Sequence, residues 1–159
     1  MQDPPLWQRL LALLPYSLTW SDALPFGRDL FSSFPSLSAL TLPAMPALLV
    51  QNMGSIGGMN LGGLLLFLLL FAAVVRNPRV PYIIRFNTLQ ALMLDILLVV
   101  VGLVFQLLQS LLGGGLLFRT LANTVFLGTL LILLFTIFQV LRGKEAELPT
   151  LSEAVRMQL

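Results

Sequence analysis

Long apolar stretches alternate with short polar ones along most of this 159-residue chain. The apolar stretches cover about 37–53, 57–75, 82–112 and 116–141. A perpendicular helix needs about 20 apolar residues to cross the hydrocarbon core of a bilayer, so the last two stretches predict tilted or protruding helices. We therefore predict an all-α polytopic membrane protein in which residues 37–141 form a bundle of about four transmembrane helices.

Helix-ending residues separate these stretches. Residues 76–81 hold two arginines and two prolines, which predict a polar turn outside the lipid. Three consecutive glycines at 113–115 suit a tight reversal between antiparallel helices. The stretch 37–53 contains Pro43 and Pro46, so it predicts a kinked helix, with a re-entrant segment as the alternative.

The two ends of the chain have a different pattern. Within 1–36, Leu6, Leu10 and Leu13 follow helical spacing, which predicts amphipathic helices lying flat in the membrane interface. A cleaved signal peptide is the alternative for the first of them, but no small-x-small cleavage site follows the leucines. In the tail 142–159, Thr150 and Glu153 stand at capping-box spacing and predict a short surface helix, with a frayed tail as the alternative.

The basic residues carry a topology signal. With four crossings, a single basic residue, Arg119, lies on one side, and eight lie on the other: Arg9, Arg28, Arg76, Arg79, Arg85, Arg142, Lys144 and Arg156. Lys and Arg near span ends are retained on the cytoplasmic side. Both termini are therefore predicted on the cytoplasmic or stromal side.

Composition narrows the chemistry. The chain has no Cys and no His, so the commonest metal ligands, the commonest general base and every Ser-His or Cys-His arrangement are excluded. Phosphate-loop and dinucleotide-binding glycine patterns are also missing, so we predict no catalytic residue, no cofactor and no enzyme. A net charge of +2 with scattered basic residues gives no indication of nucleic-acid binding.

Asp95 is the single acidic residue inside the predicted spans. Because an exposed carboxylate in lipid is costly, it is predicted to face other helices. On a helix it shares one stripe with small and polar positions that include Thr88, Gly102 and Gln106. Asp95 is thus either a conduit residue or a carboxyl that is hydrogen-bonded within the bundle. Asn123 of the last span is predicted at a different depth.

A long polar segment resembles a known family. Residues 75–91 read VRNPRVPYIIRFNTLQA and are followed by Asp95, and they are similar to the signature stretch of the twenty-kilodalton Tic family. Leu24–Arg28, Leu121–Thr124 and Ser152–Met157 extend the similarity over nearly the whole chain. That family is named for a membrane subunit of the translocon at the inner chloroplast envelope, and it has cyanobacterial and plastid-encoded relatives.

The resemblance implies a channel-forming or scaffold subunit of a protein translocation complex in a cyanobacterial membrane or the plastid inner envelope. Its implied partners are membrane lipids, other translocon subunits or copies of itself, and a translocating polypeptide. A small-solute or ion transporter and a structural membrane-assembly factor remain alternatives. The candidate functional or assembly surface comprises Arg76, Asn77, Arg79, Arg85, Asn87, Gln90, Asp95 and Asn123.

Overall fold

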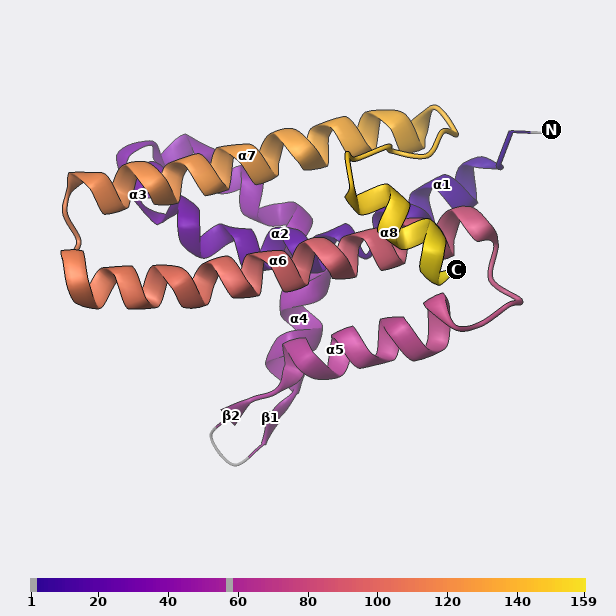
Figure 1. The fold of residues 1–159 in the computed structure, drawn as a ribbon, viewed down its shortest axis with the longest axis horizontal. Helices are drawn as coiled ribbons and strands as arrows, with labels where there is room; N and C mark the ends of the chain where they lie inside the picture. Colours follow the sequence, from indigo (N-terminus) through magenta and orange to yellow (C-terminus); the bar gives the residue numbers. More distant parts are fainter. Residues whose placement is uncertain (1–2, 57–58) are drawn as a thin grey trace.

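Two long antiparallel helices form the frame of the molecule. The computed structural model describes residues 3–56 and 59–159, and in that part the regular elements are helices apart from two short strands. Helices α6 (Tyr82–Leu112) and α7 (Leu116–Leu141) lie side by side and have the bounds predicted for the last two apolar stretches (Figure 1). Gly113 has a φ of 67°, which favours glycine, and it ends α6.

These two helices are the ones, within the described residues, that are long and apolar enough to cross a membrane. Their outer faces expose large apolar side chains, among them Leu107, Leu116 and Leu131. Such a surface suits lipid, because the apolar patch would be unusually large for water. The prediction of about four membrane-spanning helices is not confirmed, because the two earlier apolar stretches are organised differently.

Prolines and glycines divide residues 37–75. The first predicted span consists of a 3-10 helix, η2 (Pro35–Ala44), followed by the nine-residue α4 (Met45–Met53). Pro43 and Pro46 lack the N–H that a continuous α-helix needs, which explains the change of helix type. After α4, strand β1 (Ser55–Ile56) pairs antiparallel with β2 (Met59–Asn60); residues 57 and 58 of the predicted second span lie outside the described residues.

The second apolar helix is shorter than predicted. It begins at Gly62 as α5 (Gly62–Leu70) and continues as a π-helical turn, η3 (Phe71–Val75). At 1.5 Å per residue this helix is about 21 Å long, whereas the hydrocarbon core is about 30 Å thick. A Cβ on Gly62 would overlap the backbone of Gln51, so glycine here permits α4 and α5 to meet closely.

The N-terminal region packs along the two long helices. It consists of α1 (Leu6–Leu13), α2 (Tyr16–Ala23), the 3-10 helix η1 (Leu24–Gly27) and α3 (Arg28–Ser33). Arg9 donates to the carbonyl of Leu141 at the end of α7 (2.8 Å), and Asp29 pairs with Arg119 at the start of α7 (3.9 Å). The region therefore follows the whole length of α7, which differs from the flat surface helices predicted for 1–36.

The core forms where α2 meets the long helices. Tyr16, Trp20 and Ala23 are buried with Phe126 of α7, whose ring lies 5.1 Å from that of Trp20. A Cβ on Gly27 would lie 2.7 Å from the Phe126 ring, so glycine permits η1 to approach α7. Hydropathy missed this part of the core because α2 carries Thr19 and Ser21 on buried positions.

Because of this packing, Arg28 lies at the other end of the bundle from the one predicted. Arg28 and Arg119 line the same cleft beside Gly114, so Arg28 lies at the α6–α7 turn. The other seven basic residues remain at the opposite end, where both termini and the 76–81 turn also lie (Figure 1). The predicted eight-to-one division is therefore seven to two, because α1–α3 traverse the bundle.

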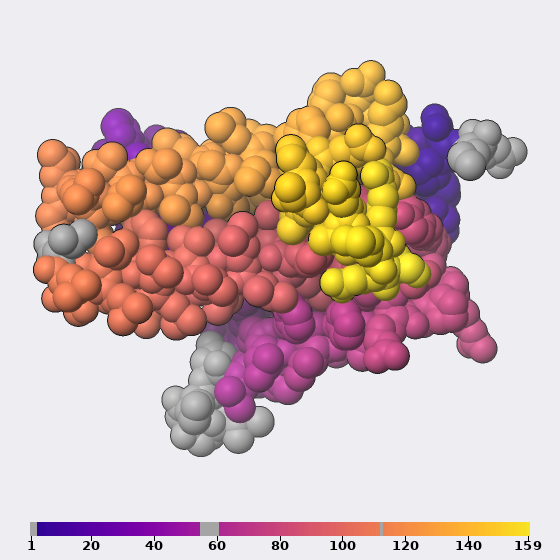
Figure 2. Space-filling view, in the orientation of Figure 1, coloured from indigo at the N-terminus to yellow at the C-terminus, as the bar shows by residue number. Residues whose placement is uncertain are grey.

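The tail ends in α8 (Leu151–Gln158). Its N-terminus is not the predicted capping box: Thr150 makes no side-chain capping bond and has a φ of 64°. Instead, the hydroxyl of Ser152 accepts a hydrogen bond from the backbone N–H of Leu148 (2.8 Å). Helix α8 packs on α6 near the chain termini, as the space-filling view also shows (Figure 2).

Candidate functional site

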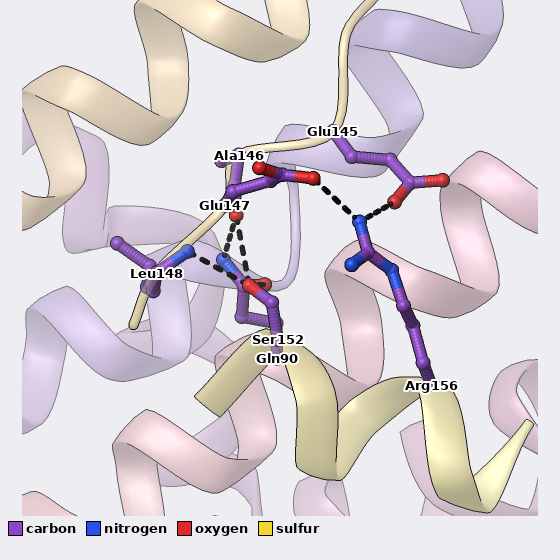
Figure 3. Close-up of polar contacts among 7 residues, drawn as sticks. All are labelled: Gln90, Glu145, Ala146, Glu147, Leu148, Ser152 and Arg156. Atoms are coloured by element: carbon purple, nitrogen blue, oxygen red, sulfur yellow. Dashed lines mark hydrogen bonds and ion pairs between the residues drawn. The ribbon is translucent and has the colours of Figure 1, made fainter. Parts of the chain in front are cut away.

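Gln90 holds the C-terminal tail against α6. Its side chain is fully buried and donates through Nε2 to the carbonyl of Ala146 (3.2 Å), while its Oε1 accepts from the Ser152 hydroxyl (3.2 Å) (Figure 3). Ser152 also lies 3.2 Å from the Ala146 carbonyl. Both ends of the amide are therefore occupied, as a buried amide requires.

Asn87, one turn earlier, holds the N-terminal region. Its Nδ2 donates to the carbonyl of Ile83 (2.8 Å), and its Oδ1 accepts from the hydroxyl of Tyr16 (3.1 Å). Thr19 adds a bond to the carbonyl of Ala91 (3.0 Å). These contacts join α2 to α6 across about 70 positions of sequence. The polar residues of the signature stretch thus bind three parts of the chain together.

The 76–85 segment is held by shorter-range bonds. Asn77 accepts from the backbone N–H of Arg79 through Oδ1 (3.0 Å), which stabilises the turn. Arg85 donates through Nε to the carbonyl of Val75 (2.8 Å), and so it caps the helix that ends there. Arg76 and Arg79 are exposed. Neither makes an ion pair within the residues that the structure describes, so both can meet an outside group.

A second contact at this end is ionic. Arg156 of α8 binds Glu145 and Glu147 at 2.8 Å each (Figure 3). The hydrogen bonds that Arg156 donates to Glu147 and then to Glu145 raise the pKa of Arg156 above its ordinary value. The tail therefore carries a cluster of three paired charges, which the candidate surface predicted from the sequence did not include.

Asp95 and Asn123 are not brought together. Asp95 is 6% exposed, and its Oδ1 has no hydrogen-bond partner in the described part of the chain; the nearest acidic group is Asp22 of α2. Asn123 on α7 likewise has an unpaired buried Oδ1 within the described residues. The prediction that these two residues lie at different depths is consistent with their positions on α6 and α7.

The second half of α6 borders an open cleft of about 710 Å³. Its polar lining comes from α6, α7 and the N-terminal region: Asp22, Arg28, Asp29, Gln106, Gln109 and Arg119. The predicted stripe below Asp95 therefore faces this cleft through Gly102, Gln106 and Gln109. The aromatic wall is formed by Phe26 and Phe118, which both contact Phe105.

Sequence reasoning missed the N-terminal half of the cleft. Arg28, Asp29 and Asp22 were assigned to a surface segment, although an Arg-Asp pair beside Phe26 was a signal that this segment faces something polar. Within the described residues no group of three or more His, Cys, Asp or Glu side chains could hold a metal ion. The cleft offers both donors and acceptors to an extended polar ligand.

The fold and the site define the class of protein. It is a small helical protein with two helices long enough to cross a membrane, one end at which buried amides join the N-terminal region and the tail to α6, and an open polar cleft. The chain belongs to a family described as "chloroplast import apparatus Tic20-like", whose model matches residues 1–155. The resemblance noted in the sequence is therefore confirmed.

Individual relatives agree with this assignment. A "Tic20 family protein" of Synechocystis sp. is 38% identical over 95% of this chain and 92% of the relative. Two Arabidopsis thaliana proteins are more distant: "Protein TIC 20-II, chloroplastic" is 28% identical over 98% of this chain and 74% of its own length, and "Protein TIC 20-v, chloroplastic" is 30% identical over 95% and 70%.

Proposed function

We propose that this chain is a membrane-embedded, non-enzymatic subunit of a protein translocation complex in a cyanobacterial membrane or the plastid inner envelope. The observation that carries the proposal is the family match over nearly the full length, with a relative in Arabidopsis thaliana named for the chloroplast Tic system. Translocon subunits and copies of this chain are its proposed partners.

The cleft supports a contact role within such a complex. It has a volume of about 710 Å³ and combines charged, amide and aromatic groups, which suit an extended polypeptide better than a small apolar ligand. It is also open to one side in a single copy. A closed conduit therefore needs a second copy or another subunit to complete its wall.

The path of the chain through the bundle differs from four successive membrane crossings. Residues 6–33 run the length of α7 in one direction, and residues 35–75 return in several short helices before α6 and α7 follow. This order keeps both termini at one end, and by the positive-inside rule we assign that end to the cytoplasm or stroma. Protease protection in sealed vesicles, read at the two termini, tests this assignment.

Photo-crosslinking tests the translocation role. A photoreactive residue in place of Gln106 should crosslink to a polypeptide arrested in transit across membranes whose import depends on this chain. The control places the same group at Leu131, which is 67% exposed on the outer face of α7. Equal crosslinking from both positions, or none from Gln106 during active import, contradicts the proposal.

One observation favours a second function, small-solute or ion transport. Asp95 is a buried carboxyl with an oxygen that has no partner in the described residues, and such groups inside membranes are often functional. In that case Asp95→Asn abolishes flux into proteoliposomes while the protein still assembles. If Asp95 only supports packing, the same variant changes stability and no flux is found in either protein.

A further inference from the structure

A separate apolar groove of about 510 Å³ lies between α1, α4, α5 and the beginning of α6. Its walls include Trp7, Leu14, Val50, Leu70 and Ile84. It shares none of the cleft's described lining residues, so its role is independent of the proposed translocation function.

The groove has a single charged lining residue among those described, Arg79. This side chain is exposed and makes no ion pair within the described part of the chain. Arg76 lies three residues earlier and is also exposed. The mouth of the groove therefore presents a positive charge that an anionic group can approach without displacing a protein carboxylate.

The rest of the described lining is apolar apart from Ser17 and Thr88, and the Thr88 side chain is completely buried. The groove therefore offers an outside group one exposed charge, on Arg79, and a long apolar wall.

We propose that this groove binds one anionic phospholipid. The phosphate pairs with the guanidinium of Arg79 at the mouth, and an acyl chain lies along the apolar wall formed by α1, α4, α5 and the beginning of α6.

A neighbouring groove provides an internal comparison. This second apolar groove, of about 370 Å³, is formed by α1, α2, η2 and α7, and none of its described lining residues is charged. It includes Trp20, whereas the first groove includes Trp7. These are the two tryptophans of the chain, so each groove has its own fluorescent reporter.

The test is quenching of tryptophan fluorescence in detergent micelles by lipids brominated in the acyl chain. The signal of Trp7 is the difference between the natural chain and Trp7→Phe, and the remaining signal comes from Trp20. We expect phosphatidylglycerol to quench Trp7 at about fivefold lower mole fraction than phosphatidylcholine, as one arginine near an anionic headgroup gives. Trp20 should show no headgroup preference.

Two variants sharpen the result. Arg79→Gln should abolish the preference at Trp7. The matched control is Arg142→Gln, which removes an exposed arginine stacked on Phe138 at the same end of the molecule and should leave the preference intact. Equal quenching of Trp7 by both lipids, or a preference that survives Arg79→Gln, overturns the proposal.

Inorganic phosphate separates a lipid site from a simple anion site. Added at millimolar concentration, it should leave quenching by phosphatidylglycerol unchanged, because the acyl chain contributes most of the binding. Release of the brominated lipid by phosphate would show that the groove mouth is an ion site, and would overturn the lipid assignment.

Discussion

The two halves of α6 use polar residues in opposite ways. In the first half, Asn87 and Gln90 are fully buried and each has its amide oxygen and nitrogen bonded to another group. In the second half, Gln106 and Gln109 are exposed along an open cleft. In the view of Figure 2, α8 lies over the first half and leaves the second uncovered.

This difference indicates that the polar residues of the first half of α6 stabilise the fold, whereas those of the second half can bind other molecules. A buried amide with all its bonds made fixes the segments that it joins, and removing it leaves unpaired groups behind. An exposed amide beside a cleft contributes little to folding and remains available to a ligand. Variants in the first half should therefore change stability, and variants in the second half should change interactions.

Gln90→Ala should have the largest effect on stability. It removes a buried side chain and leaves the Ala146 carbonyl and the Ser152 hydroxyl with fewer partners, so we expect a loss of about 3 kcal/mol in unfolding free energy. Unfolding by sodium dodecyl sulfate in mild detergent, followed by circular dichroism, measures it. Gln106→Ala, on the same helix, is the control and should unfold like the natural chain.

Tyr16→Phe should have a smaller effect. The variant keeps the ring in the core and removes the hydroxyl that donates to Asn87 Oδ1 (3.1 Å), so a loss of about 1 kcal/mol is expected in the same assay. A neutral result would mean that Asn87 does not need this bond to hold α2 against α6.

The sequence predicted the two long helices of the molecule but not the contacts that the N-terminal region and the tail make with them. Helices α6 and α7 follow from two long apolar runs bounded by Pro81, three glycines and Arg142. The path of α1–α3 did not, because Pro15 and Pro25 interrupt its apolar runs and the buried Thr19 resembles a surface residue. In the candidate surface, residue type identified Gln90 and Asn87, but their partners Ala146 and Tyr16 are distant in sequence.

Asp95 lies at the boundary between the two halves of α6, and its replacement by Asn should have a small effect on stability. An amide there avoids the cost of burying a carboxylate and can donate to the carboxyl of Asp22, so stability should rise by about 0.5 kcal/mol. The denaturation assay above measures it, with Asp3→Asn as an exposed acidic control. A marked loss of stability instead would show that the carboxylate of Asp95 has a cationic partner.

Arg119→Gln should change stability least. Its distance to Asp29 is 3.9 Å, and the two side chains are 62% and 43% exposed, so the pair contributes about 0.3 kcal/mol. The same variant removes one of two arginines from the cleft, and it should therefore lower crosslinking from position 106 to an arrested polypeptide. Arg142→Gln, outside the cleft, should leave that crosslink unchanged. If Arg119→Gln unfolds the chain as readily as Gln90→Ala does, the cleft end also holds the fold together, and the contrast between the two halves of α6 is wrong.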